Sequence, residues 1–409
     1  MSKNKKIIPE LRFPEFANEA EWEKKTLNSV SEVIMGSSPS STSYNENKFG
    51  LPLLQGNADI KNRVSAPRIY TSEITKECEI NDILLSVRAP VGTVAKSLHN
   101  ACIGRGISAI RTIDQNSQEY LYQWLLSYES SWENISQGGT FDAVNSDDIK
   151  KLLLPIPKPP EQQKIASCLS SLDDTIFAYI QKLELLKDQK KGLMQNLFPQ
   201  EGENVPKYRF PEFVKKGDWV EKILDEVAIF LKGKGISKAD IVENGSLPCI
   251  RYGELYTYYK ETISTVKSYT NLSADDLVLS EANDVIIPAS GETQIDIATA
   301  SCVLQKGIAL GGDLNIIRSK IDGVFLSYYL NNVKKKDIAQ MAQGIAVVHL
   351  YPNQLRTLII QIPKPKEQRK IANCLSSLDA LITAQTDKIE TLKLHKRGLM
   401  QRLFPKIND

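Results

Sequence analysis

The stretch PIPKPPEQQKIASCLSSLDDTIFAYIQKLELLKDQKKGLMQNLFP, residues 155–199, decides the fold, because the chain repeats it as QIPKPKEQRKIANCLSSLDALITAQTDKIETLKLHKRGLMQRLFP, residues 361–405. Of the 43 positions aligned between residues 157–199 and 363–405, 28 are identical. An internal repeat of this fidelity indicates one structural unit that the protein uses twice.

Each copy has the pattern of a long helix that buries one narrow stripe. Its stripe residues follow one another at alternating intervals of four and three, which is the a/d spacing of a coiled-coil seam. A Pro-rich segment precedes each run and Phe-Pro follows it, as expected where a helix begins and ends. The predicted seam residues are Ile165, Leu169, Leu172, Ile176, Tyr179, Leu183, Leu186 and Leu193 in the first copy, and Ile371, Leu375, Leu378, Ile382, Gln385, Ile389, Leu392 and Leu399 in the second.

The beginning of the chain is repeated as well. LRFPEFANEAEW, residues 11–22, returns as YRFPEFVKKGDW, residues 208–219, with Arg, Phe, Pro, Glu, Phe and Trp at matching places. The order of segments is therefore A-B-A′-B′. We expect a first globular domain at residues 1–156, a central helix at 157–204, a second globular domain at 205–361 and a C-terminal helix at 362–409.

The two A segments are predicted to be α+β domains. Short β-rich runs such as DILLSVRAPVGTVAKSL and DVIIPAS are broken by Gly, Pro, Asn and Ser, and a short helical stretch follows in each segment. Between the copies the strand pattern persists while the loops change, as in LPLLQGNADIKN against LPCIRYGELYTY. This difference is typical of one scaffold that reads two targets. The alternating tyrosines of IRYGELYTYYK favour a half-buried strand over a base-stacking loop.

The two helices are expected to pair with each other, antiparallel, around a pseudo-two-fold axis. A helix from Glu161 to Leu197 would be roughly 55 Å long and must bury its stripe. In full antiparallel overlap Tyr179 would meet Gln385, while Lys190 and Lys396 would reach Asp379 and Asp173. A parallel seam between two separate chains is the alternative.

Composition and motifs exclude several classes of protein. The 51 Lys and Arg against 49 Asp and Glu neither require nor exclude nucleic acid. The sequence contains no signal-peptide pattern and no apolar run of about 18 residues, so we expect a cytoplasmic protein. Six scattered cysteines and three histidines indicate neither a metal site nor a disulfide framework. GRGISA, residues 104–109, fits a dinucleotide fingerprint only formally, because it lies between strand-like runs, and we interpret it as a turn.

The remaining functional signal is a set of side chains suited to DNA. Arg, Lys, Asn and Gln can meet base edges, whereas Ser, Thr and Lys can hold phosphates. The predicted DNA-binding residues are Ser38, Ser41, Gln55, Asn57, Lys61, Arg63, Arg88 and Arg105 in the first A segment, and Lys232, Lys234, Lys238, Arg251, Tyr252, Tyr256 and Lys306 in the second.

The doubled Pro-rich start with Glu-Gln, followed by a heptad helix ending in GLMQNLFP or GLMQRLFP, closely resembles the specificity subunit of type I restriction-modification enzymes over the whole chain. The resemblance implies that the globular domains at residues 1–156 and 205–361 are target-recognition domains. Each would bind one half of a bipartite, asymmetric sequence in double-stranded DNA, and the helices would set the gap. The resemblance also implies docking of two modification (methyltransferase) subunits and, through them, two restriction (translocase and endonuclease) subunits. Catalysis, with S-adenosylmethionine, ATP and Mg²⁺, would belong to those partners, and this chain would bind no cofactor or metal and have no catalytic residue.

The residues alone leave two other functions open. One is an autonomous DNA methyltransferase or nuclease, which would act without partners. The other is a coiled-coil scaffold that joins proteins without reading DNA.

Overall fold

The structure is a computed structural model that describes residues 7–132, 143–344 and 347–405. The chain divides into two compact units, residues 1–180 with 387–409 (the first unit) and residues 181–386 (the second unit). Each unit therefore contains one recognition domain, the beginning of one long helix and the end of the other.

The recognition domain of the first unit is built on two larger sheets and a short ribbon. The sheets have the strand orders β2-β12-β9-β10-β6-β5 and β3-β7-β4-β11-β8, and β1 pairs with β13 in an antiparallel ribbon. The strands are β1 (Glu23–Thr26), β2 (Ser31–Met35), β3 (Tyr44–Asn45), β4 (Leu51–Leu54), β5 (Ile60–Lys61), β6 (Val64–Ser65), β7 (Ile69–Thr71), β8 (Glu77–Cys78), β9 (Ile83–Ser86), β10 (Val94–Lys96), β11 (Ala101–Ile103), β12 (Ile107–Thr112) and β13 (Leu153–Ile156), and the shorter helices are α1 (Gln118–Tyr128) and α3 (Ser146–Lys150).

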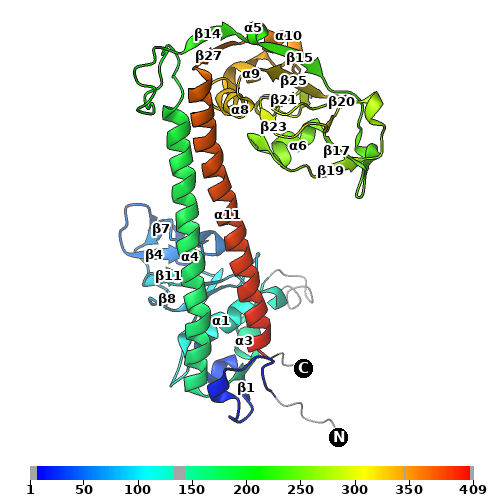
Figure 1. Cartoon of the computed structure of the whole chain (residues 1–409). Helices are drawn as coiled ribbons and strands as arrows, with labels where there is room; N and C mark the ends of the chain where they lie inside the picture. Colours follow the sequence, from blue (N-terminus) through cyan, green and yellow to red (C-terminus); the bar gives the residue numbers. More distant parts are fainter. Residues whose placement is uncertain (1–6, 133–142, 345–346, 406–409) are drawn as a thin grey trace. The chain divides into compact units, whose positions relative to one another are not determined.

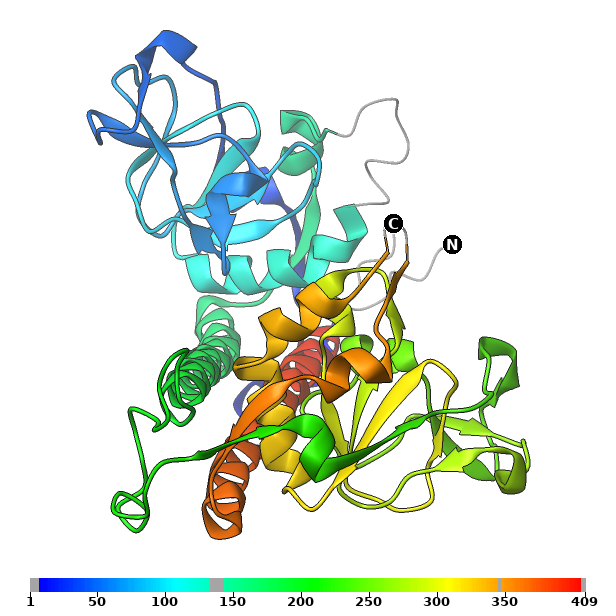
Figure 2. The same ribbon diagram turned by 90° about the horizontal axis from the view of Figure 1, so that it is seen from above.

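The recognition domain of the second unit has the same plan. Its larger sheets have the orders β15-β25-β21-β23-β18 and β16-β19-β17-β24-β20, while β14 pairs with β27 and β22 with β26. Figure 2 shows β14 (green) and β27 (orange) side by side. The strands are β14 (Val220–Ile223), β15 (Ala228–Lys232), β16 (Ile241–Val242), β17 (Leu247–Ile250), β18 (Thr262–Ile263), β19 (Ser268–Thr270), β20 (Val278–Leu279), β21 (Asp284–Pro288), β22 (Ser290–Gly291), β23 (Ser301–Val303), β24 (Ala309–Leu310), β25 (Leu314–Ser319), β26 (Val348–His349) and β27 (Ile359–Ile362), and the shorter helices are α5 (Leu224–Val227), α6 (Tyr252–Thr257), α7 (Gln294–Ile297), α8 (Gly323–Asn332), α9 (Lys335–Met341) and α10 (Pro352–Arg356).

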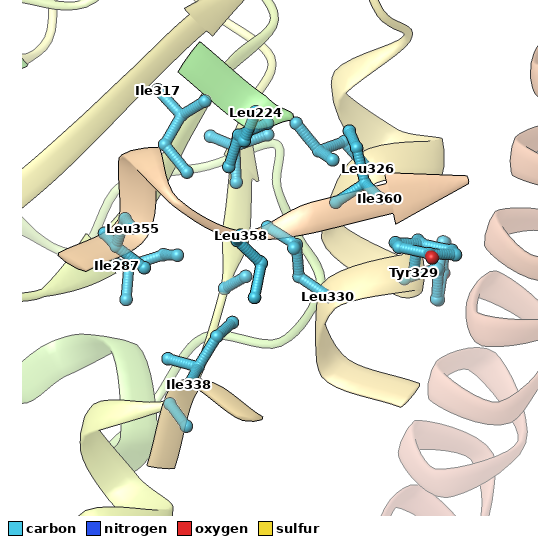
Figure 3. Close-up of a cluster of buried hydrophobic side chains, with 14 of the residues drawn as sticks. Leu224, Ile287, Ile317, Leu326, Tyr329, Leu330, Ile338, Leu355, Leu358 and Ile360 are labelled. Carbon is cyan, nitrogen blue, oxygen red and sulfur yellow. The ribbon is translucent and has the colours of Figure 1, made fainter. Parts of the chain in front are cut away.

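Apolar side chains from strands and helices close the core of each domain. In the second domain, Leu224, Ile287 and Leu330 come from different elements and meet around Leu358, with all four side chains at most 2% exposed (Figure 3). Burial of one such side chain contributes about 1.5–3 kcal/mol to folding. This core fixes the sheet whose strands end at the loops described below.

The α+β fold class is confirmed, and so are the strands expected in DILLSVRAPVGTVAKSL, which form β9 and β10. The expectation of a strand through the tyrosines of IRYGELYTYYK is wrong, because Tyr252–Thr257 forms the helix α6. Tyr252 and Tyr256 stand one helical turn apart, with ring centroids 6.5 Å apart, and the Glu254 side chain accepts a hydrogen bond from the backbone N–H of Arg251. Local capping therefore outweighs the alternation of aromatic residues.

The long helices are α4 (Pro159–Asn196) and α11 (Pro365–Leu403). In the first unit the beginning of α4 packs against the end of α11, since Ile165 and Leu169 share a core cluster with Leu403 and Phe404. In the second unit the end of α4 packs against the beginning of α11 in the same way, through Leu193 and Leu375. The helices are thus antiparallel, as expected, in each unit (Figure 1).

Every predicted seam residue is buried or half-buried along α4 and α11. The predicted contact between Lys396 and Asp173 is present, with Nζ 2.6 Å from Oδ1, and so is that between Lys190 and Asp379, at 2.8 Å. Lys190 also lies 3.2 Å from a carboxylate oxygen of Glu261. The predicted meeting of Tyr179 with Gln385 would join the two units and stays a prediction.

A buried clamp explains why the RFPEF and Glu-Gln motifs are both repeated. Arg12 donates from Nε and Nη2 to the two carboxylate oxygens of Glu161, each at 2.7 Å, at the start of α4. The second unit repeats this contact between Arg209 and Glu367 at 2.7 and 2.8 Å. All four side chains are less than 10% exposed, so each pair is a desolvated, bidentate ion pair.

The glutamine of each Glu-Gln pair completes the clamp. Gln162 accepts from the backbone N–H of Ser117 and donates to the carbonyl of Pro157. Gln368 does the same with Asp322 and Pro363. We call the Arg–Glu pair with its neighbouring glutamine the junction; it fixes each recognition domain to the start of the helix that follows it.

The same N-terminal segment also holds the end of the other helix. The N–H of Leu11 donates to the carbonyl of Arg402 at 2.9 Å, and the N–H of Tyr208 donates to that of Asn196 at 2.8 Å. Each domain is therefore fastened to one helix start and one helix end by equivalent contacts.

In the described ranges, no helix is long and apolar enough to cross a membrane, and no three His, Cys, Asp or Glu side chains come together as metal ligands. The six cysteines are free thiols; Cys78, Cys102, Cys249 and Cys302 are buried, and the two on the long helices are half-buried.

Candidate nucleic-acid interface

Four loops of the first recognition domain meet at one end of its strands. They follow β2 (residues 36–38), β4 (55–57) and β9 (87–88), and the fourth is the turn between β11 and β12 (104–106). Backbone hydrogen bonds connect them, from Ser37 N–H to the Ile103 carbonyl at 2.9 Å and from Val87 N–H to the Gly106 carbonyl at 2.9 Å. We call these four loops the loop edge. It brings together residues that are up to 70 positions apart in sequence.

Glycines allow the loops to come this close. A Cβ added to Gly36 would lie 2.2 Å from the carbonyl oxygen of Gly104, and one added to Gly106 would lie 2.2 Å from that of Gln55. GRGISA is therefore a turn, as interpreted from the sequence, and its glycines serve close backbone packing.

The second recognition domain builds its loop edge on the same hydrogen-bond frame. Gly104 N–H donates to the Leu54 carbonyl at 2.8 Å in the first domain, and Gly311 N–H donates to the Ile250 carbonyl at 2.9 Å in the second. Lys234 N–H binds the Leu310 carbonyl as Ser37 N–H binds that of Ile103, and a Cβ on Gly233 would lie 1.9 Å from the Gly311 oxygen. The equivalent positions are 37 and 234, 38 and 235, 41 and 238, 55 and 251, 88 and 290, 105 and 312, and 143 and 349.

In the first domain the loop edge positions polar side chains. Gln55 donates from Nε2 to the Tyr44 hydroxyl at 2.7 Å, which orients its amide. The Ser38 hydroxyl accepts from the N–H of Arg105 at 3.2 Å, while the side chains of Arg88 and Arg105 are exposed. A fixed amide beside two exposed guanidinium groups is chemically suited to base edges.

In the second domain the same edge carries Lys234 and Lys238, both exposed, and Arg251, which is half-buried. Arg251 Nε lies 3.5 Å from Glu254 and makes no hydrogen bond in the structure described. Tyr252 and Tyr256 follow on α6. Burial raises the pKa of the Tyr256 hydroxyl, helped by Tyr252 and by the nearby charge of Glu292, so the phenol stays neutral and able to donate.

Several predicted DNA-binding residues lie elsewhere or are already engaged. The Arg63 guanidinium forms a two-pronged ion pair with Glu129 and also donates to the Val94 carbonyl, so it is already engaged within the domain. Its contact with DNA stays a prediction. Lys306 lies between β23 and β24, outside the loop edge, and pairs at 3.1 Å with Glu281, which precedes β21. Lys61 and Lys232 are exposed on β5 and β15 outside the four loops, Asn57 lies in the loop after β4, and Ser41 continues the loop after β2.

Three residues at the loop edge were not predicted. They are Ser37 in the first domain, and Ser290 and His349 in the second. Ser37 and Ser290 are equivalent in position to Lys234 and Arg88 of the other domain, and the Ser290 hydroxyl lies 3.2 Å from Nδ1 of His349. The signal that could have found them was the glycine before or beside each loop, at residues 36, 104, 233 and 311. A glycine that recurs in both repeats marks a close backbone approach.

The family model for the type I restriction modification DNA specificity domain matches the chain twice, at residues 19–187 and 216–394. The chain belongs to this family. Each matched specificity domain contains one recognition domain with its loop edge and most of the long helix that follows it.

Curated relatives of the chain come from Methanocaldococcus jannaschii. The type I restriction enzyme MjaIX specificity subunit is 26% identical over 94% of this chain and 92% of that protein. The putative MjaX specificity subunit is 35% identical over 43% of this chain and 42% of its own length.

Two solved structures share the fold at 17% sequence identity. The S subunit of a type I restriction-modification system from M. genitalium matches 98% of this chain and 100% of its own, with a TM-score of 0.66. A chain from a study of complex assembly and conformational transition in the type I R-M system matches 93% of this chain and 97% of its own, with a TM-score of 0.54.

Proposed function

We propose that the chain is the DNA sequence-specificity subunit of a type I restriction-modification complex, and that each recognition domain binds one half of a bipartite, asymmetric DNA target at its loop edge. The loop edge carries this proposal, because the two domains share its backbone frame while their exposed side chains differ. Base identity is read by side chains, so one frame with two sets of side chains reads two different words.

The paired helices supply the distance between the two words. A continuous helix of 38 or 39 residues is a stiff connector, unlike a flexible linker, and its length fixes how far apart its ends lie. Two readers on one duplex must be held in step with its helical repeat of about 34 Å. The helices would therefore set the number of unread base pairs between the half-sites.

The repeated junction favours two equivalent partner sites. Two copies of one partner need two equivalent surfaces, and in this chain the junction residues and 28 of the 43 aligned helix positions recur in both copies. We propose two modification subunits on these surfaces and two restriction subunits joined through them, in the cytoplasm. Methylation and cleavage, with S-adenosylmethionine, ATP and Mg²⁺, would take place on those partners.

The direct experiment is a map of methylated bases in DNA from cells that express this chain with its modification partner. The proposal predicts a word in two defined parts separated by a gap of constant length. A single uninterrupted word would contradict it. Methylation without any sequence requirement would favour the scaffold function instead.

A further inference from the structure

The cations of the two loop edges alternate between the domains. At five pairs of equivalent positions, one domain has Lys or Arg and the other has a small or neutral residue. The pairs are Ser37 and Lys234, Ser41 and Lys238, Gln55 and Arg251, Arg88 and Ser290, and Arg105 and Gly312. The first domain has its cations after β9 and between β11 and β12, whereas the second has them after β15 and β17.

These cations also differ from others nearby in having no carboxylate that neutralises them fully. Among the described residues, Arg88, Arg105, Lys234 and Lys238 form no ion pair and no side-chain hydrogen bond. By contrast, Arg63, Lys96 and Lys306 are each paired with a glutamate. Arg251 is intermediate, with Glu254 at 3.5 Å. Unpaired, exposed cations are available for phosphate oxygens and base edges.

The two sets also differ in kind. The first domain presents two arginines, whose planar forks suit the O6 and N7 atoms of guanine. The second presents one arginine with two lysines, and lysine acts as a point charge that anchors phosphates. Arg251 is restrained beside α6, which suits it to base reading, while Lys234 and Lys238 lie on the preceding loop.

We infer that the two domains bind their half-sites through different loops of their equivalent loop edges. The first domain binds through Arg88 and Arg105, and the second binds through Lys234, Lys238 and Arg251. This inference rests on the proposed function and specifies which residues determine the readout in each half. It follows that corresponding loops of the two domains do not perform corresponding contacts.

Reciprocal substitutions test the inference, because each imports a residue that the same backbone position already has in the other domain. One variant combines Arg88→Ser with Arg105→Gly, and the other combines Lys234→Ser, Lys238→Ser and Arg251→Gln. Lys24→Ser on β1 and Lys320→Ser directly after β25 are matched controls that also remove exposed cations. Each variant is assembled with its modification partner, and its methylation map and its DNA affinity across salt concentrations are measured.

The arginine variant should relax one half of the word by about 10- to 100-fold and leave the other half intact. The lysine-containing variant should affect only the other half, and it should lower the slope of log affinity against log salt by about two, one for each lost phosphate contact. The controls should keep both halves. Partner assembly should be unchanged in both variants, and thermal unfolding should be unchanged in the arginine variant, whose replaced side chains are exposed. Arg251→Gln removes the cation 3.5 Å from the buried Glu254 carboxylate and should lower stability. The Lys234→Ser and Lys238→Ser pair is therefore also measured without it.

The outcomes distinguish a failure of the proposed function from a failure of the present inference. If the unsubstituted complex recognises no two-part word, the proposed function fails. If its word has two parts but both variants weaken the same half, or either variant leaves both halves intact, only the present inference is overturned.

Discussion

The junction and the loop edge are both repeated, but at different levels. At the junction the residues themselves recur, Arg12 with Glu161 and Arg209 with Glu367, at the same distances. At the loop edge only the backbone hydrogen bonds and the glycines recur, while the side chains are replaced. The side chains are repeated at the junction, which sets the geometry between domain and helix. Only the backbone geometry is repeated at the loop edge, which reads the target.

Removing the arginine of a junction should destabilise the protein most. Arg12→Ala leaves the Glu161 carboxylate buried without its cation, which costs about 3–5 kcal/mol in the free energy of unfolding. Arg209→Ala should cost less, because Trp219 Nε1 still donates to Glu367 at 3.3 Å whereas Trp22 Nε1 makes no hydrogen bond in the described structure. Denaturant unfolding of the full chain measures both. Lys164→Ala, which removes an exposed pair with Glu15, is the control and should leave the free energy of unfolding nearly unchanged. An equally small effect of Arg12→Ala would refute the stabilising role of the junction.

The two lysine contacts in the helix pair should be unequal. Lys190→Met leaves two facing carboxylates, Asp379 and Glu261, each with a side chain 16% exposed, and should cost about 2–3 kcal/mol. Lys396→Met leaves Asp173 alone, 39% exposed and still bound by Gln123, and should cost about 1 kcal/mol. Unfolding measurements on both variants give the order, and the reverse order would contradict this reading of the seam.

A methyl group in the close backbone contact should distort one loop edge only. Gly36→Ala places a Cβ 2.2 Å from the Gly104 carbonyl oxygen, which forces a shift that costs about 1–3 kcal/mol. Gly56→Ala in the neighbouring loop meets nothing within 4 Å and serves as the control. The methylation map of the Gly36 variant should show weaker discrimination in one half of the word. If both variants behave alike, the loops do not depend on this contact.

The smallest effect concerns pH and belongs to the first unit. Burial by itself would raise the pKa of Glu119, but hydrogen bonds from Lys96 and Ser170 outweigh it and lower the pKa below the ordinary 4.5. A carboxylate with a lowered folded-state pKa stabilises the protein above its ordinary pKa, and this contribution disappears as the pH falls through the lowered value. The stability difference between the natural chain and Glu119→Gln should therefore be largest near neutral pH and shrink below about pH 4.5. At the equivalent position the second unit has Val324, so Val324→Gln should show no such dependence.

Residues that act through local periodicity could be predicted from the sequence. The heptad stripe gave α4 and α11, and its register placed Lys396 opposite Asp173 and Lys190 opposite Asp379. The loop edge could be predicted only as a collection of polar residues, because its assembly depends on sheet order, which brings residue 37 beside residue 103. The ion pair of Arg63 with Glu129 joins positions 66 apart in sequence, and no local sequence pattern indicates it. The junction was visible as two repeated motifs, but their direct contact required the fold.

Inserting one helical turn at facing levels of both α4 and α11 tests directly whether the helices set the spacing between the half-sites. The quantity to measure is the length of the gap in the methylated word. One turn adds about 5.4 Å to the helix pair, and base pairs are spaced about 3.4 Å apart along the duplex. If the helices set this spacing, the gap should be longer by one or two base pairs, with both half-words unchanged. An unchanged gap, or an altered half-word, would contradict it.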